Sequence, residues 1–273
     1  MIVDVPTTVQ TLLRTYLGLA DEELPGRIVG FYLIGSITLE DFRPHRSDVD
    51  FVAVTARPLD DAALAALARI HDGVNARHPQ RPLDGIYLTR DHLARDPALC
   101  PPVPYVHERQ FHPSGRFELS PVTWATLARH GLVVRGPAPS DLGVWDDPST
   151  LDRWIRENLE TYWRPWLARF GRLLSREGLA SLGPWATEWG ALGVTRLHYT
   201  LARGAIASKH EAGLYALRRF PARWHPVIIE ALRIRRGTGR SPYRWPFSRR
   251  RDMLAYVEMA IDDALSLPVF HLP

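Results

Sequence analysis

Two aspartates, Asp48 and Asp50, lie two residues apart at the start of the segment DVDFVAVT. The Val, Phe and Thr residues of this segment favour a β-strand. Residues two apart on a strand point to the same face, so both carboxylates should project together. Neighbouring carboxylates repel each other unless a cation lies between them. Oxygen ligands of this kind suit Mg²⁺, which proteins usually hold with one or two carboxylates plus substrate phosphates.

A Gly-Ser pair, Gly35-Ser36, ends the apolar run RIVGFYLI shortly before these aspartates. Glycine lets the backbone come close to a ligand, and the serine hydroxyl and amide can then hold a phosphate oxygen. A Gly-Ser pair or an Asp-x-Asp motif alone is common in surface turns. In the order strand, Gly-Ser, short spacer, Asp-x-Asp and second strand, they indicate a site for a nucleoside triphosphate and a metal ion.

Transfer of a nucleotidyl group to a hydroxyl also needs a base for the incoming hydroxyl. Asp84 in RPLDGIYLT is the best-placed carboxylate, because it opens the third strand of what would be one mixed sheet. The alternative is that Asp84 only caps this strand. The sequence therefore predicts Asp48 and Asp50 as metal ligands and Asp84 as the catalytic base.

The elements that must position these side chains form the first half of the chain. Apolar spacing predicts an α/β domain with a mixed sheet and flanking helices. The stretch around PALCPPVP should be irregular, with a short strand or turn at RFELS. The expected helices are 7–19, 58–77 and one near 121–130, and the expected strands are 27–36, 48–55, 83–89 and 132–137.

After residue 147 the pattern becomes helical, and Asp147-Pro148-Ser149 is typical of a helix start. We therefore expect a catalytic domain at 1–148 and an all-α helical bundle that binds nucleotide and substrate at 149–273. The expected helices of this second domain are 150–176, 184–204, 208–218, 222–235 and 249–266.

Composition restricts the class of protein. Hydrophobic residues make up 45% and charged residues 23%, as in ordinary globular domains. No apolar run approaches the ~20 residues of a membrane span, and the N-terminus has no signal-peptide pattern. Cys100 is the only cysteine, which excludes an internal disulfide. We expect a cytoplasmic monomer without a membrane partner.

The formal net charge of +4 is small for this length, which argues against a nucleic-acid partner. The most basic segment, 233–251, is either a solvated loop and helix start or a patch for phosphates or an acidic partner. Arginine supplies nearly all the positive charge, and Lys209 is the only lysine. Its compact ammonium differs from the planar guanidinium of arginine, which makes Lys209 a candidate for a specific role, although chance could also leave one lysine.

The segment from Gly35 to Asp50 resembles the signature of the DNA polymerase β-like nucleotidyltransferase superfamily. More narrowly, the chain is similar to the aminoglycoside adenylyltransferases that modify streptomycin and spectinomycin. Their motif runs from Gly-Ser through Pro-His-Ser to Asp-x-Asp, and here Pro44-His45-Arg46-Ser47 makes it one residue longer. The family base is a glutamate, and Asp84 stands in its place. The resemblance implies nucleotide contacts for Gly35, Ser36 and Ser47.

The resemblance continues through Thr195-Arg196-Leu197 and Ala207-Ser208-Lys209, which implies that Arg196 and Lys209 contact nucleotide phosphates. The segment at 226–228 also fits. The streptomycin-binding members carry tryptophans and aspartates just before the arginine helix. Here that stretch offers Trp185 and Glu188 as candidates for binding the acceptor, with core packing as the alternative for the tryptophan. The identity of the acceptor does not carry over.

These observations predict a Mg²⁺-dependent enzyme that moves AMP from ATP to a hydroxyl of a small polar acceptor, with an aminoglycoside as the expected class. Such an enzyme would confer antibiotic resistance. One alternative keeps the chemistry but uses another metabolite, a protein or an RNA end as acceptor. Another is a non-catalytic nucleotide sensor of the same fold.

Overall fold

The computed structural model describes residues 5–269. The chain divides between Asp147 and Pro148 into two compact units, called here the N-terminal and the C-terminal unit. Each is described by itself.

One six-stranded sheet forms the centre of the N-terminal unit, in the order β5-β4-β3-β2-β1-β6. Strands β2 and β3 are parallel and every other neighbouring pair is antiparallel, which confirms the expected mixed sheet. The strands are β1 (Ile28–Ile34), β2 (Val49–Thr55), β3 (Leu83–Thr89), β4 (Val103–His107), β5 (Gln110–Gly115) and β6 (Leu132–Arg135).

The parallel pair follows from the helix that connects it. Parallel strands need a crossover, and α2 (Asp61–Arg77) supplies it between β2 and β3. Asp60 caps this helix, because its side chain accepts a hydrogen bond from the Ala63 amide. A parallel crossover also brings the first residues of both strands to the same edge of the sheet, so the start of β2 lies beside the start of β3.

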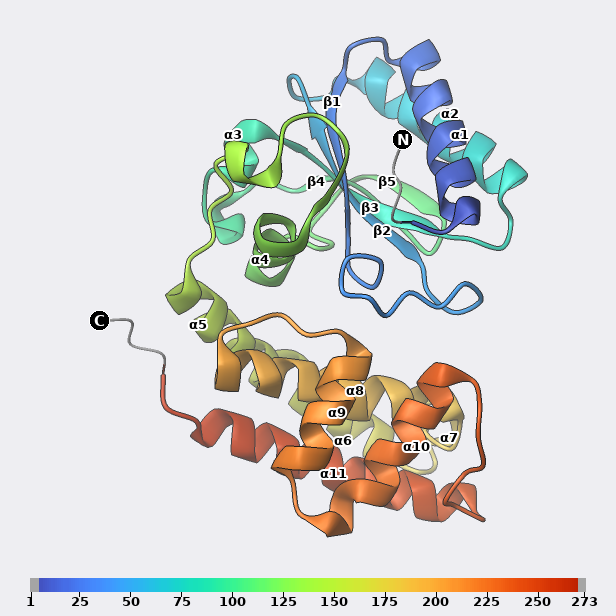
Figure 1. Ribbon diagram of the computed structural model, residues 1–273, viewed down its shortest axis with the longest axis vertical. Coiled ribbons are helices and arrows are strands. Elements are labelled where there is room, and N and C mark those ends of the chain that lie inside the picture. Colours follow the sequence, from blue (N-terminus) through green and yellow to red (C-terminus); the bar gives the residue numbers. More distant parts are fainter. Residues whose placement is uncertain (1–4, 270–273) are drawn as a thin grey trace. The chain divides into compact units, whose positions relative to one another are not determined.

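Helices cover both faces of the sheet (Figure 1). α1 (Thr7–Glu23) and α2 pack on one face, against Phe31, Phe51 and Tyr87 among others. α3 (Arg90–Leu93) and α4 (Pro121–His130) pack on the other, where Tyr32, Val52 and Ile86 belong to a second core. Because both faces are covered, the central strands are apolar throughout instead of alternating.

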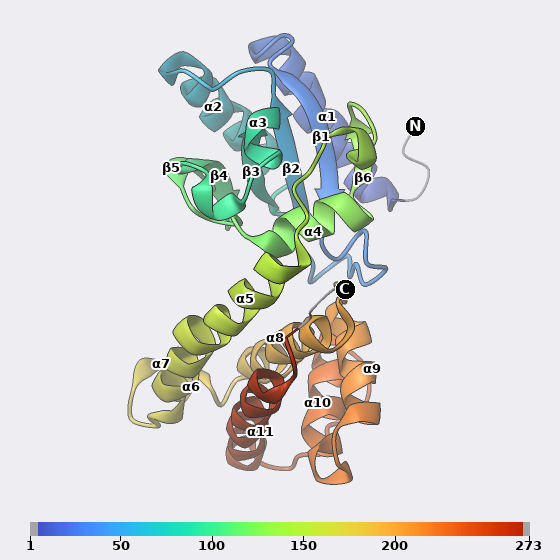
Figure 2. The ribbon, with the colours of Figure 1, turned by 90° about the vertical axis from the view of Figure 1, so that its left-hand side faces the viewer.

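The C-terminal unit is helical, as expected, with α8 at its centre (Figure 2). α8 contacts α5, α9, α10 and α11. Within residues 5–269 no helix combines the length and apolarity needed to cross a membrane. The helices are α5 (Pro148–Asn158), α6 (Arg164–Gly171), α7 (Arg176–Ala180), α8 (Pro184–Arg203), α9 (Lys209–Arg219), α10 (His225–Arg236) and α11 (Pro246–Ser266).

Two local expectations were wrong. The helix expected over 150–176 is interrupted by a π-helical turn, η3 (Leu159–Trp163), and it ends at Gly171. Pro165 follows this turn and has no amide hydrogen to donate, which accounts for the local change in winding. The stretch expected to be irregular after Cys100 contains the hairpin of β4 and β5.

Candidate active site

Asp50 and Asp84 are direct neighbours across the parallel strands β2 and β3. Residues paired in this way point to the same face of a sheet, here the face that also carries Val52 and Ile86. Asp50 is partly exposed and Asp84 is buried, with 5% of its surface accessible. Asp48 lies one residue before β2 and is exposed. The sheet therefore places two of the three predicted carboxylates side by side, with the third at the same strand end.

Gly35 adjoins this pair at the end of β1, where Ile34 is the neighbour of Asp50. Its φ of +69° is a conformation that L side chains rarely adopt. A Cβ added at Gly35 would clash with Asp50 Oδ2 and lie 3.0 Å from Asp50 Cγ. Glycine is therefore required both by the backbone and by the carboxylate that packs against it.

The loop that follows Gly35 contains Ser36, whose hydroxyl forms no hydrogen bond with the described residues. Ser36 Oγ is buried and has no hydrogen-bond partner in the described part of the chain. Buried polar atoms are normally paired, and an orphaned one at a predicted phosphate site is what a missing ligand would leave. The Ser36 carbonyl accepts the Asp41 amide at 3.0 Å, and Ser47 Oγ accepts the Arg43 amide at 3.0 Å. These bonds fold the loop back toward β2.

The carboxylate of Asp84 is held by the turn between β4 and β5. Its Oδ2 accepts the Glu108 amide at 2.9 Å, and its Oδ1 accepts the Arg109 amide at 3.5 Å. His107 Nδ1 lies 3.5 Å from Oδ2. Glu108 and Arg109 both have positive φ, +47° and +69°, as a two-residue hairpin turn requires. Asp84 thus stabilises a strained turn, and the turn in return fixes the direction of its carboxylate.

Arg109 also attaches this turn to α2. Its Nη2 donates to the Asn75 carbonyl at 3.0 Å, its Nη1 donates to the Pro79 carbonyl, and Asn75 Nδ2 donates to the Arg109 carbonyl at 2.8 Å. Sequence reasoning missed this support. A short strand pair joined by Glu-Arg lacks the Asn-Gly or Asp-Gly signal that marks such turns.

The carboxylates fit a hard divalent cation. Within residues 5–269 no group of three or more His, Cys, Asp or Glu side chains gathers closely enough to hold a metal ion by itself. Magnesium, however, is usually bound by one or two carboxylates with substrate phosphates and water completing its shell. Asp48 and Asp50, at the strand end where Gly35 packs against Asp50, have the donor chemistry for that arrangement.

The C-terminal unit holds the other predicted nucleotide ligands close together. Lys209 begins α9, and its Nζ lies 3.6 Å from Glu188 Oε1 and 5.3 Å from the centre of the Trp189 ring. Arg196, on α8, donates from Nε to the Ala207 carbonyl at 3.0 Å, two residues before Lys209. The two basic side chains are thus linked through the short connection between α8 and α9.

Glu188 is buried, with 8% of its surface accessible, and contacts two cations. Besides Lys209, the Arg235 guanidinium lies 3.7 Å from its Oε1. Arg235 was not among the candidates from the sequence, because nothing in the spacing of α10 separates it from the neighbouring arginines. Glu188, which is predicted to contact the acceptor, therefore lies beside Lys209, which is predicted to contact the phosphates.

Trp185 lies at the start of α8 with 57% of its surface accessible. Its ring stacks on Trp189 with centroids 5.9 Å apart and an interplanar angle of 11°. Trp189 in turn stacks on Trp163 at 6.0 Å. The exposure of Trp185 therefore does not fit the core-packing alternative for this tryptophan.

Comparisons with known proteins agree with this description. Residues 184–259 match the family described as "Aminoglycoside adenylyltransferase, C-terminal domain". No curated protein sequence matches the chain. Among solved structures, the fold is similar to spectinomycin adenyltransferase AAD(9) from Enterococcus faecialis, solved with ATP and spectinomycin. The TM-score is 0.67 at 14% identity, over 93% of this chain and 98% of that one.

The matched family segment contains α8, α9 and α10 and includes the four site residues predicted for this unit, namely Trp185, Glu188, Arg196 and Lys209. The structural match extends over both units. Together they support the prediction of an adenylyltransferase enzyme. The chain therefore resembles the aminoglycoside adenylyltransferases in its fold and in the sequence of its C-terminal unit, which confirms the resemblance inferred from its motifs.

Proposed function

We propose that this chain is a Mg²⁺-dependent adenylyltransferase that moves AMP from ATP to a hydroxyl of a small polar acceptor, with an aminoglycoside as the first candidate. The observation that carries the proposal is the placement of Asp50 beside Asp84, next to Gly35 and the unpaired Ser36 hydroxyl. The C-terminal family match supports the choice of an aminoglycoside as the first candidate acceptor.

In the proposed reaction the acceptor oxygen attacks the α-phosphorus of ATP, the bond to the bridging oxygen breaks, and pyrophosphate leaves. Asp48 and Asp50 would hold Mg²⁺, which would neutralise charge on the phosphates. Ser36 would donate its hydroxyl proton to a phosphate oxygen.

Asp84 would take the proton of the attacking hydroxyl. A carboxylate offers about four acceptor positions, so the two amide bonds to Asp84 leave room for a substrate hydroxyl. Since both amides come from one rigid turn, the carboxylate would keep its direction while the acceptor binds. Such preorganisation matters, because a misplacement of about 1 Å can reduce the rate roughly a hundredfold.

For the C-terminal unit we propose that Arg196 and Lys209 bind the triphosphate and that Trp185 and Glu188 contact the acceptor. The open face of Trp185 suits a sugar or cyclitol ring, which stacks on aromatic side chains. The Glu188 carboxylate already lies beside Lys209 and Arg235. A phosphate bound by these cations would compete with it for their charge, and a cationic drug group would be attracted to it.

The decisive experiment is transfer of label from α-labelled ATP to a panel containing spectinomycin, streptomycin and other aminoglycosides, with pyrophosphate release measured in parallel. Asp48→Ala and Asp50→Ala should abolish both signals. Asp72→Asn, which removes an exposed carboxylate on α2, is the matched control and should leave them unchanged.

Each rival gives a different result. Binding of MgATP without pyrophosphate release for any acceptor would identify a nucleotide sensor. Labelling of an RNA end, with an affinity for RNA that falls steeply as the salt concentration rises, would identify RNA as the acceptor. Absence of both MgATP binding and transfer would rule out the proposed function.

A further inference from the structure

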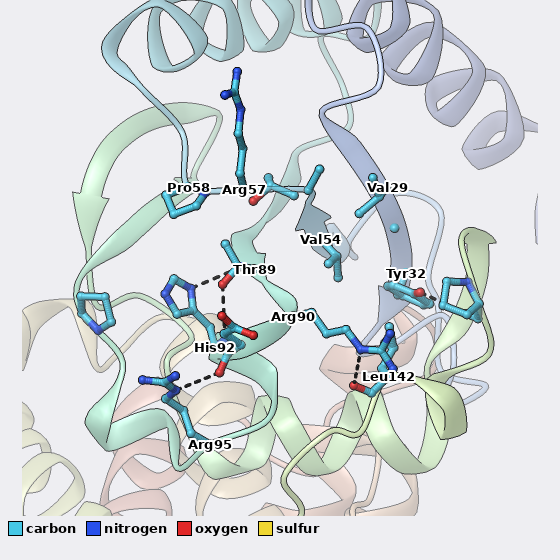
Figure 3. Close-up of a pocket in the computed structure, with 16 residues that line it drawn as sticks. Val29, Tyr32, Val54, Arg57, Pro58, Thr89, Arg90, His92, Arg95 and Leu142 are labelled. Atoms are coloured by element: carbon cyan, nitrogen blue, oxygen red, sulfur yellow. Dashed lines mark hydrogen bonds between the residues drawn. The ribbon is translucent and has the colours of Figure 1, made fainter.

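A cavity lies in the N-terminal unit, at the opposite end of the sheet from the carboxylates. Its volume is about 610 Å³, and its walls include Gly30 near the start of β1, Thr55 at the end of β2 and Thr89 at the end of β3 (Figure 3). From Asp50 to Thr55 the strand advances about 17 Å, at ~3.3 Å per residue. A ligand in this cavity would not touch the proposed catalytic residues.

Positive charge dominates the lining of this cavity. Arg57, Arg90 and Arg95 contribute three guanidinium groups, against one carboxylate from Asp91. In the range 5–269, none of these three arginines forms an ion pair with a carboxylate. The cavity therefore carries excess positive charge that the protein itself does not neutralise by ion pairing.

Two of these guanidinium groups are nevertheless held in place. Arg90 Nε donates to the Leu142 carbonyl at 3.4 Å and its Nη2 donates to the Asp141 carbonyl, while Arg95 Nε donates to the Asp91 carbonyl at 2.8 Å. Carbonyl oxygens fix a guanidinium without cancelling its charge, and each group has five N–H donors, so several remain for a ligand. Figure 3 shows Arg90 reaching toward Leu142 and Arg95 beside His92, whereas Arg57 extends away from both.

His92 adds a neutral donor to the same wall. Its Nδ1 accepts the Thr89 amide at 3.3 Å, so the uncharged ring carries its proton on Nε2. Burial and the nearby Arg95 charge lower the pKa of His92, while Asp91 raises it. The ring is therefore neutral near pH 7.

Most of the remaining lining is apolar. Tyr32, Val54 and Leu142 are buried members of the core beneath the cavity, and the exposed apolar residues of its lining are Val29 and three prolines. Apolar walls with a few fixed polar groups are typical of pockets for small organic molecules. Guanidinium groups select carboxylates and phosphates, because their planar donors match two oxygens at once.

We propose that this cavity binds a small organic anion, in which a phosphate or carboxylate group sits on an apolar body. Arg90 and Arg95, which Figure 3 shows on different sides of His92, offer two positions for the anionic group, and the exposed Val29 and Pro137 contact the apolar part. The site is separate from the proposed catalytic residues and does not depend on the proposed function.

The first test uses phenyl phosphate, phenylacetate and the uncharged benzyl alcohol as probes on the full-length protein, followed by ¹H–¹⁵N NMR. Either anion should cause saturable shifts in the amides of 55–57 and 89–95, and benzyl alcohol should bind at least about tenfold more weakly. Which of the two anions binds more tightly distinguishes a phosphate from a carboxylate ligand. Absence of shifts with both anions, shifts confined to 35–50, or equal binding of benzyl alcohol would overturn the proposal.

The second test uses variants. Arg90→Gln/Arg95→Gln should weaken the better anion at least about tenfold, whereas Arg14→Gln/Arg240→Gln, which removes the same charge from exposed positions elsewhere, should not. Ala56→Phe fills the cavity from an exposed lining position and leaves every guanidinium in place, so it should weaken binding equally. Unchanged affinity in Ala56→Phe, or equal losses in both arginine pairs, would contradict a built site.

Discussion

Asp50 on β2 and Asp84 on β3 are paired residues of the parallel strands, so their carboxylates leave the same face of the sheet from adjacent strands. The two differ in surroundings. Asp50 packs against Gly35 and is partly exposed, while Asp84 is buried and accepts two amide hydrogens. Two carboxylates in such different environments are suited to different tasks, and the tasks proposed here are metal binding for Asp50 and proton removal for Asp84.

Replacing Asp50 with Asn keeps the size of the side chain and removes its charge. If Asp50 holds the metal ion, kcat should fall roughly a thousandfold, since a metal supplies several kcal/mol of charge stabilisation. The measurement is steady-state transfer with the best acceptor of the panel, together with a Mg²⁺ titration. A kcat within threefold of wild type would remove Asp50 from the metal site.

Gly35→Ala tests the contact between the loop and Asp50. The new Cβ would meet the Asp50 carboxylate, and φ is +69°. Gly26→Ala is the matched control, because Gly26 has the same φ of +69° and nothing lies within 4 Å of an added Cβ. Both variants should lose about 1 kcal/mol of stability from backbone strain, but only Gly35→Ala should lose activity. Equal activity of the two would show that the contact is dispensable.

Ser36→Ala should separate binding from stability. The hydroxyl has no partner among residues 5–269, so its removal should leave the free energy of unfolding unchanged or slightly higher. Loss of a hydrogen bond to a charged phosphate should raise the KM for ATP about tenfold or more. Denaturation curves and ATP kinetics on the same preparation check both halves. A destabilised variant with normal KM would mean that the hydroxyl serves the fold.

Asp84 combines a structural and a proposed chemical role, and two variants distinguish them. Asp84→Asn retains an oxygen for the Glu108 amide, so the turn should persist while kcat falls about 10²–10⁴-fold. Asp84→Ala leaves both turn amides without an acceptor and should also destabilise the protein by about 1–3 kcal/mol. An Asn variant with near-normal kcat would assign Asp84 to the turn alone, the capping alternative.

The sequence predicted the central strands and the carboxylate positions because apolar runs and Asp spacing are local signals. The direct pairing of Asp50 with Asp84 could not be predicted from these signals, because the register of the parallel strands depends on how α2 connects them. The β4–β5 hairpin was not predicted, because Glu108 and Arg109 adopt positive φ only with help from Asp84 and Asn75, which lie far away in sequence.

The C-terminal residues show the same limit. Spacing predicted that Arg196 and Lys209 lie on helices, and the resemblance supplied the roles proposed for them. The contacts of Glu188 with Lys209 and Arg235 join three helices, and a local sequence pattern does not predict contacts between helices. The cavity beside Arg90 was missed for a similar reason, because its walls come from the ends of three strands.

The last prediction concerns His71, which is buried in the core between α2 and the sheet. Its Nε2 lies 2.6 Å from the Tyr87 hydroxyl, which also bonds the Tyr16 hydroxyl at 2.9 Å. Burial lowers the pKa of His71 to about 3, so the folded protein keeps this ring neutral where the unfolded chain, with a pKa of about 6.5, becomes protonated.

Between these two values the unfolded state binds the extra proton, so stability is complete above pH 6.5 and falls as the pH drops toward 3. The loss due to His71 should reach about 1.4 kcal/mol per pH unit in that window. His71→Phe removes the titration, and Tyr87 still has Tyr16 as a partner. Urea denaturation at pH 7, 6 and 5 should therefore show a shallower pH dependence in the variant, whatever its stability at pH 7. Parallel curves for the two proteins would mean that the ring titrates normally in the fold and that water reaches this core.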